Sequence, residues 1–326
     1  MDKLYPLKFR PILKEKVWGG SRLHSMYDKG PVASGSCGES WEISTLRGNV
    51  SVVCNGFLEG NELVDLIEVY MGDLVGEFVY ENFGNVLPLL VKFIDSTEPL
   101  SVQVHPGDHH FAAEKPGSGK SELWYVVAAE PGAKIYVGFN RELNASGLLT
   151  HLQEKTIPQV LNTEQVSAGD VFYIPAGRIH AIGGGVTLCE IQQSADTTYR
   201  LYDWDRPGMD GKPRALHVAQ ALEVIDFRLE RSYRTHYTEP RNGSVTLHAS
   251  PPFTVNLLSF DRKIGSDFYF LDSFVVYVCL EGAFTLQYPG GQETISKGET
   301  LLVPAGIKTL ELLPAGPCKL IESYIA

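Results

Sequence analysis

Residues 167–182, SAGDVFYIPAGRIHAI, hold the pattern that decides the fold, because residues 296–312, SKGETLLVPAGIKTLEL, repeat it. Both stretches read Ser-x-Gly-acid, then four mostly apolar residues, then Pro-Ala-Gly. A self-similar pattern of this kind is typical of two copies of one supersecondary unit. The sequence therefore predicts two related β-barrels in tandem.

The two copies differ at one position that matters for chemistry. His180 stands three residues after Gly177 in the first copy, whereas Thr309 stands three residues after Gly306 in the second. The Pro-Ala-Gly turn serves the fold in both copies, so the turn itself does not need His180. This difference argues against a packing role for His180 and makes it a candidate metal ligand.

Short β-type segments dominate the chain from residue 86 onward, with turn residues between them. They span residues 86–95, 99–106, 121–130, 133–140, 169–177 and 187–193. Helical periodicity covers about residues 59–84, with Asn61 as the expected N-cap, and about residues 141–162. Many short strands with few helices favour a sandwich or jelly roll, so the predicted fold is mainly β with helical segments.

The composition limits the partners and the compartment. The 326 residues include 28 Lys plus Arg against 39 Asp plus Glu, a formal net charge of −11, which disfavours nucleic acid or an anionic membrane as partner. Five scattered cysteines have the spacing of neither a disulfide framework nor a metal knuckle. The first 20 residues lack an apolar run long enough for a signal peptide or a membrane span. We expect a soluble cytoplasmic protein, a monomer or homodimer.

The stretch LSVQVHPGDHH, residues 100–110, alternates apolar and polar side chains as a strand with two unlike faces does. Gln103 and His105 fall on its polar face. By the same period, Lys120 and Glu122 share a face of the segment that follows. A Gln-x-His pair alone is weak evidence for a metal site. Together, an amide oxygen, two imidazoles and a carboxylate suit zinc, with iron, manganese or cobalt also possible, and the candidate ligands are Gln103, His105, Glu122 and His180.

Six motifs in order carry a family resemblance. They are WGG (18–20), GESWEIS (38–44), LSVQVHP (100–106), KSELWYV (120–126), PAGRIHAIGGG (175–185) and ADTTYRLYDWDRPG (195–208). The Pro-x-Gly-x-x-His pattern resembles the metal motifs of cupins. The six motifs together resemble the type I mannose-6-phosphate isomerases in their short bacterial form, from about Tyr5 to the end of the chain.

This resemblance implies two cupin (jelly-roll) barrels in tandem. Residues 1–240 would form a catalytic domain with an N-terminal extension and the helical segments, and residues 241–326 a degenerate cupin without metal ligands. The implied activity is interconversion of mannose 6-phosphate and fructose 6-phosphate through an enediolate, with one zinc ion per chain. In this family the metal ligands fall on Gln103, His105, Glu122 and His180.

The resemblance also implies functional residues around the metal, at Trp18, Glu39, Ser101, Lys120, Asp196 and Arg200. A guanidinium stays protonated, so Arg200 is expected to bind the enediolate or sugar oxygens and not to act as a base. Lys120 is expected near the phosphate or the reacting oxygens. Asp196 is expected either to orient Arg200 or to exchange a proton.

The remaining residues are assigned to substrate binding or proton transfer. Trp18 would wall the sugar site and Ser101 would donate to phosphate. Arg206 is the cation nearest to the position where eukaryotic members carry a lysine. Glu39, Asp196, a metal-bound hydroxide and His109 are all candidates for proton transfer, and the sequence does not choose between them.

Two other functions fit parts of the pattern. The first is a different metal-dependent cupin enzyme, either an oxygenase or a related sugar-phosphate isomerase, because the same ligands hold other metals. The cations Lys120, Arg200 and Arg206 favour an anionic substrate over an oxygenase. The second is a non-catalytic sugar-binding cupin, which predicts a missing ligand in the first copy, whereas all four ligands are present.

Overall fold

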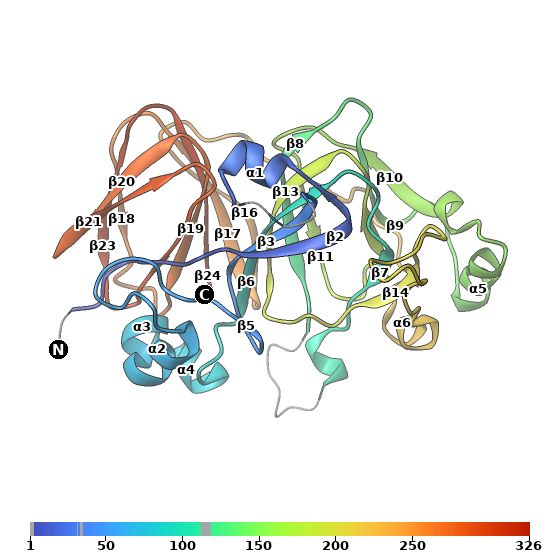
Figure 1. Cartoon of the computed structure of the whole chain (residues 1–326), viewed down its shortest axis with the longest axis horizontal. Helices are drawn as coiled ribbons and strands as arrows, with labels where there is room; N and C mark the ends of the chain where they lie inside the picture. The colour runs from blue at the N-terminus through green and yellow to red at the C-terminus, as the bar shows by residue number, and fades with distance from the viewer. Residues whose placement is uncertain (1–2, 31, 33–34, 112–118) are drawn as a thin grey trace.

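Strands are the main regular elements of the molecule, and the helices lie at its ends and edges (Figure 1). The computed structural model describes residues 3–30, 32, 35–111 and 119–326. These residues form several separate sheets, each with two edge strands, so no described sheet closes on itself by hydrogen bonding. The prediction of a mainly β fold is confirmed.

The molecule has two halves, and the first half, residues 12–235, builds two sheets that face each other. The larger sheet has, in spatial order, β15 (Arg234–Thr235), β11 (Val171–Ile174), β8 (Glu122–Ala129), β13 (Val186–Gln193), β6 (Leu89–Ser96), β2 (Ile12–Gly20) and β3 (Cys37–Ile43). The smaller sheet has β10 (Leu161–Gln165), β9 (Lys134–Phe139), β12 (His180–Ile182), β7 (Val102–Val104) and β14 (Tyr199–Tyr202). Apolar side chains from both sheets, including Trp124, Ile135 and Leu188, form one core between them.

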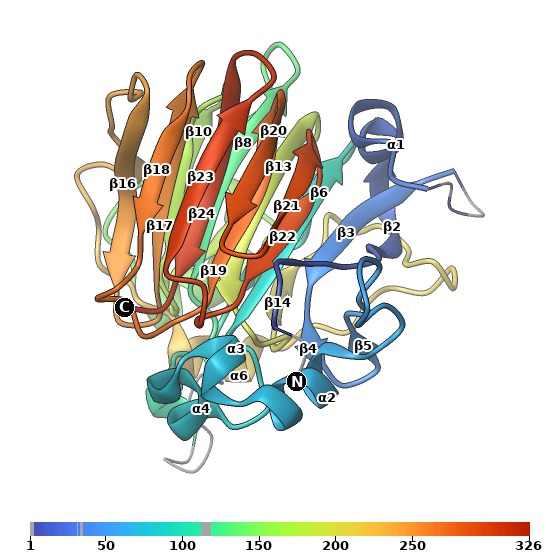
Figure 2. The same ribbon diagram turned by 90° about the vertical axis from the view of Figure 1, so that its left-hand side faces the viewer.

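The C-terminal half builds a second pair of sheets, shown toward the viewer in orange and red in Figure 2. The larger has β1 (Leu7–Lys8), β22 (Thr300–Val303), β19 (Val275–Glu281), β24 (Cys318–Tyr324), β17 (Phe253–Phe260) and β16 (Gly243–Ser250). The smaller has β18 (Ile264–Asp267), β23 (Thr309–Pro314), β20 (Ala283–Tyr288) and β21 (Gly291–Ser296). Through β1, the start of the chain joins a sheet built mainly by its end.

The order of the strands is the same in both halves. The run β11-β8-β13-β6 corresponds to β22-β19-β24-β17, and the run β10-β9-β12-β7 corresponds to β21-β20-β23-β18. The Pro-Ala-Gly stretches follow β11 and β22, which occupy corresponding places. The sequence repeat is therefore a repeat of strand order across eight strands in each half.

The two large sheets pack against each other through an apolar layer. It contains Phe93 and Ile191 from the first half and Val276, Val278 and Ile321 from the second, all at most 1% exposed. Burial of each such side chain contributes about 1.5–3 kcal/mol before ordering costs. This layer fixes the second half against the back of the sheet that carries the candidate site.

The predicted helix over about residues 59–84 is three short helices, α2 (Leu63–Tyr70), α3 (Gly72–Val75) and α4 (Glu77–Phe83). Met71 at φ 46° and Gly76 at φ 95° separate them, since positive φ is incompatible with a right-handed helix. The expected N-cap Asn61 was wrong: α2 is preceded by Glu62, and the Asn61 amide donates instead to the Leu58 carbonyl.

The other helices flank the sheets. They are α1 (Arg22–Tyr27), α5 (Ala145–Gln153), α6 (Val218–Val224) and the single-turn helices η1 (Asp108–His110) and η2 (Ile157–Gln159), and a small hairpin joins β4 (Thr45–Leu46) to β5 (Asn49–Val50). The helix expected within residues 141–162 is α5. No helix in the described ranges has the length and hydropathy needed to cross a bilayer.

Candidate active site

Three strands of the first half bring the predicted ligands together. His180, the first residue of β12, pairs directly with Gln103 of β7. His105 follows β7, and Glu122 is the first residue of β8 on the facing sheet. Side chains from both sheets therefore meet at one end of the space between them.

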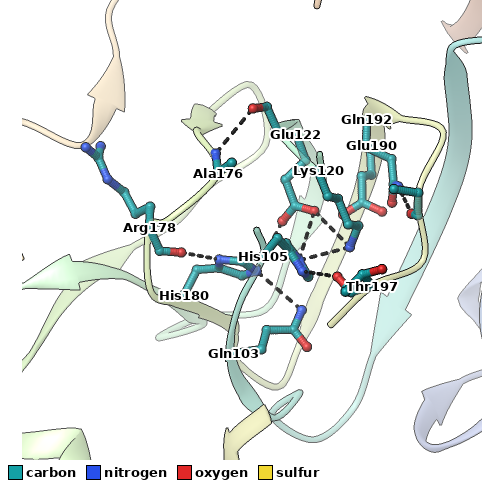
Figure 3. A network of polar contacts seen from close by, with 12 residues as sticks. Gln103, His105, Lys120, Glu122, Ala176, Arg178, His180, Glu190, Gln192 and Thr197 are labelled. Atoms are coloured by element: carbon teal, nitrogen blue, oxygen red, sulfur yellow. Dashed lines mark hydrogen bonds and ion pairs between the residues drawn. The ribbon is translucent and has the colours of Figure 1, made fainter. Parts of the chain in front are cut away.

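The three strongest ligand candidates meet at one buried point (Figure 3). One ligand atom each from His105, Glu122 and His180 lies within 4.8 Å of the others. The Nε2 atoms of His105 and His180 lie 3.5 and 3.3 Å from the Glu122 carboxylate oxygens. The Gln103 amide lies 3.3 Å from His180 Nε2 and so reaches the same centre.

Both imidazoles are oriented as metal ligands. His105 Nδ1 lies 2.9 Å from the Thr197 carbonyl, and His180 Nδ1 lies 2.8 Å from the Arg178 carbonyl. A carbonyl only accepts, so each Nδ1 donates and each Nε2 keeps its lone pair toward Glu122. Burial, with the nearby Lys120 ammonium, lowers the pKa of His105 to about 3, and burial likewise lowers the pKa of His180.

Glu122 carries a buried negative charge that has a lysine beside it but no hydrogen-bond donor. Neither carboxylate oxygen has a hydrogen-bond partner, although Lys120 Nζ lies 3.2 Å from one of them. Burial alone would raise the pKa of Glu122, but the Lys120 ammonium holds it well below its ordinary value. An ionised carboxylate and two imidazole lone pairs around one point fit a divalent cation.

A pocket of about 300 Å³ opens beside this centre. Seven of the predicted site residues line it, namely Trp18, Glu39, Ser101, Gln103, Lys120, Asp196 and Arg200. Arg206 is not among the lining residues; it lies 3.1 Å from Asp203 and 3.6 Å from Glu98. The Arg200 guanidinium donates to the Ala215 carbonyl at 2.9 Å, and Asp196 is exposed at the pocket wall.

Sequence reasoning missed one positively charged residue of the pocket, Arg214. Arg214 lines the pocket and forms two hydrogen bonds to Asp203, at 2.6 and 2.5 Å. Asp203 thus serves both Arg206 and Arg214, while Arg200 lies close enough to both arginines that burial and their charges lower its pKa. Arg214 stands in a loop without a motif, and no local signal marks it.

A buried charged row on the large sheet was also missed. Lys92 of β6, Glu190 of β13 and Trp124 of β8 are register neighbours, and all line the pocket. Lys92 Nζ lies 3.0 Å from Glu190, and Trp124 Nε1 donates to Glu190 at 2.9 Å. The available signal was a charge inside an apolar strand, LLVKFID, because a lysine there needs a buried partner.

The strand register shows which residues of the second half stand where the ligands stand in the first. His180 pairs with Gln103, and in the corresponding strands Thr309 pairs with Asp267. In the same way, Val275 takes the place of Glu122, because each pairs with the residue before the Pro-Ala-Gly stretch. Among the described residues, the only group of three or more His, Cys, Asp or Glu that could hold a metal is the one in the first half.

Several known proteins resemble this chain in both sequence and fold. Residues 6–154 match the family model for the catalytic domain of type I phosphomannose isomerase. A mannose-6-phosphate isomerase of Streptococcus mutans is 36% identical over 98% of each chain, and mannose-6-phosphate isomerase ManA of Bacillus subtilis is 39% identical over 68% of each. A crystal structure of mannose 6-phosphate isomerase from Bacillus subtilis covers 98% of this chain and 99% of its own at 30% identity, with a TM-score of 0.87.

Proposed function

The chain belongs to the type I phosphomannose isomerase family, and we propose that it interconverts mannose 6-phosphate and fructose 6-phosphate in the pocket beside Glu122. The observation that carries this proposal is the buried ligand set: an ionised glutamate without hydrogen-bond partners faces two imidazole lone pairs. A cationic pocket adjoins it. Family membership rests on relatives that match nearly the whole chain.

We propose that Gln103, His105, Glu122 and His180 hold one zinc ion. Imidazole and carboxylate ligands suit zinc, and the two carbonyls that orient the histidines supply the supporting hydrogen bonds such sites use. When bound, the ion would lower the energy of the negative charge that develops on the sugar oxygens during isomerisation.

Lys120 connects the metal centre to the substrate. Its ammonium lies 2.9 Å from His105 Nε2, and it also lines the pocket. His105 Nε2 has one lone pair, so Lys120 loses that hydrogen bond once the nitrogen is a ligand. Its ammonium is then available for the reacting oxygens of the sugar, where a positive charge stabilises the enediolate.

Proton transfer between C2 and C1 needs a general base, and a carboxylate can serve if it is ionised and in contact with the sugar. Glu39 meets the first condition: burial opposes its ionisation, but Lys92 and Lys16 lower its pKa below the ordinary value. It accepts from Trp41 Nε1 at 2.7 Å, which fixes its orientation. We assign the proton transfer to Glu39 and Asp196, the carboxylates predicted from the sequence, and the contact with the enediolate oxygens to Arg200.

The phosphate group is assigned to Arg214, which lines the pocket, with Arg206 beside it; these two and Arg200 are called here the arginine cluster. Asp203 pairs with Arg206 and Arg214, and Glu98 lies 3.6 Å from Arg206, so with Arg200 the cluster keeps a net positive charge. Arg200 and Arg214 line the pocket, and Arg200 Nε is buried without a hydrogen-bond partner. A dianionic phosphate is the kind of ligand that such donors bind. Ser101 adds a hydroxyl at the opposite wall.

Three coarser expectations accompany this function. The shared strand order of the two halves supports a tandem of cupin units. The net charge of −11 supports a small sugar phosphate as partner, without nucleic acid or membrane. We propose a cytoplasmic enzyme that works as a monomer or homodimer.

The test is a coupled assay for fructose 6-phosphate formed from mannose 6-phosphate. We expect activity that chelation removes and zinc restores. His180→Ala should lower kcat/KM by at least about a hundredfold, since a bound dication supplies several kcal/mol. His151→Ala, a partly buried histidine on α5 that contacts Thr156, is the matched control and should keep wild-type activity.

Other outcomes would point elsewhere. Turnover that is unaffected by chelation and by His180→Ala contradicts a metal-centred isomerase. Oxygen consumption with an iron-loaded protein and no isomerisation would favour the oxygenase alternative. Binding of the sugar phosphate without turnover in the zinc-loaded protein would favour the non-catalytic alternative.

A further inference from the structure

A second pocket lies in the C-terminal half at the place that corresponds to the active-site pocket. It has a volume of about 420 Å³, and its wall includes Leu258 on β17, Ser266 and Asp267 on β18, and Glu322 on β24. The active-site pocket is lined from the corresponding strands β6, β7 and β13. The pocket has thus been kept in the half that has no metal ligands.

Glu322 has the same register position in its half as Glu190 has in the first. Each glutamate pairs with an aromatic residue on one neighbouring strand and with a polar residue on the other. Asn256 Nδ2 donates to the Glu322 carboxylate at 2.9 Å, and Tyr277 OH donates at 2.8 Å. Ser266 lies on the pocket wall beside Glu322. These contacts hold the carboxylate in place, and its remaining lone pairs can accept from a ligand hydroxyl.

The lining excludes the substrate of the first pocket. No lysine or arginine is among the described residues that line the second pocket, and Asp267 and Glu322 place two carboxylates there. A phosphate dianion would be repelled. A metal ion is also disfavoured, because these two carboxylates belong to no group of three or more ligand side chains in the described part of the chain.

The remaining chemistry suits a neutral ligand rich in hydroxyl groups. Asp267 and Glu322 accept hydroxyl donors, Ser266 both donates and accepts, and Phe268 adds an aromatic surface for the apolar face of a ring. We propose that this C-terminal pocket binds a neutral monosaccharide or a related polyol, independently of the isomerase site.

Titration of D-mannose into the full-length His180→Ala protein, followed by calorimetry, tests the proposal. We expect saturable binding that Asp267→Leu weakens by about tenfold or more, the loss of one good polar contact. Asp267 is exposed, and its Oδ1 accepts from the Tyr269 amide at 2.9 Å, so the substitution affects one surface turn and no buried packing. Asp261→Leu is the matched control, because Asp261 is an exposed aspartate near β18 that does not line the pocket. It should leave mannose affinity unchanged.

Mannose 6-phosphate separates the two pockets. Its affinity should be the same with and without Asp267→Leu, since it binds only beside the metal site. In an otherwise unaltered chain, Asp267→Leu should keep kcat and KM for isomerisation, so failure of this proposal is distinguishable from failure of the isomerase function. Undetectable mannose binding, equal mannose affinity in the Asp267→Leu variant, or an equal loss of mannose 6-phosphate affinity would each overturn it.

Discussion

Replacing Arg214 with methionine tests whether the arginine cluster binds the phosphate group. Arg214 lines the pocket and is held by two hydrogen bonds to Asp203. In the variant, Asp203 keeps its contact with Arg206 at 3.1 Å, so the buried carboxylate stays paired. Methionine keeps the apolar stem of the arginine. The substitution therefore removes charge from the pocket with little effect on packing.

The expected magnitude follows from the lost contact. A hydrogen bond to a charged group contributes about 1.5–3 kcal/mol, so kcat/KM for mannose 6-phosphate should fall by about 10- to 150-fold. Most of the loss should fall on KM, because the phosphate does not change during the reaction and its binding is uniform in ground and transition states.

The coupled assay measures this loss, and competitive inhibition by inorganic phosphate provides an independent readout. The inhibition constant for phosphate should rise by the same factor as KM. Arg234→Met is the matched control, because Arg234 pairs with Asp170 outside the pocket and should leave both constants unchanged. A KM within about twofold of wild type, or a phosphate inhibition constant that does not move, would refute the assignment.

Three further predictions concern stability. Asp272→Ala should lower the free energy of unfolding in urea by about 1 kcal/mol without changing activity. The reason is that the Asp272 carboxylate accepts from the first two backbone amides of α4 at 2.9 Å. Loss of activity at full stability would contradict this. Burial opposes ionisation of Asp203, but its arginine partners lower its pKa below the ordinary value. Its contribution to the free energy of unfolding is therefore present above the unfolded-state pKa and is lost as the pH falls below about 4. Asp203→Asn should show a shallower acid loss of stability, and an identical pH profile would contradict this. Zinc at about 100 times its dissociation constant should stabilise the metal-free protein by about 2.7 kcal/mol in thermal unfolding. It should not stabilise the His180→Ala variant. An equal gain in stability in both proteins would place the ion elsewhere.

Local patterns in the sequence identified the candidate ligands and six strands around them, β6, β7, β8, β9, β11 and β13. A strand period of two is a property of neighbouring residues, so Gln103 and His105 could be placed on one face before any fold was known. The Pro-Ala-Gly repeat indicated two related units, and the contrast between His180 and Thr309 indicated which unit carries the chemistry. The break of the helix over residues 59–84 was not visible, because Met71 adopts a positive φ that its residue type does not favour.

Only the tertiary structure decided how the site is completed. The sequence by itself determined which side chains have the chemistry of metal ligands, because that chemistry belongs to each residue type. Arg214, Lys92 and Glu190 reach the pocket through pairings between strands and loops far apart in the chain, and no local period encodes such pairings. The same long-range register sets Thr309 beside Asp267, where His180 and Gln103 meet in the first half, so the described residues of the C-terminal pocket hold no comparable ligand group. Register and sheet packing fix the distances between residues remote in sequence, and these distances determine what the site can bind.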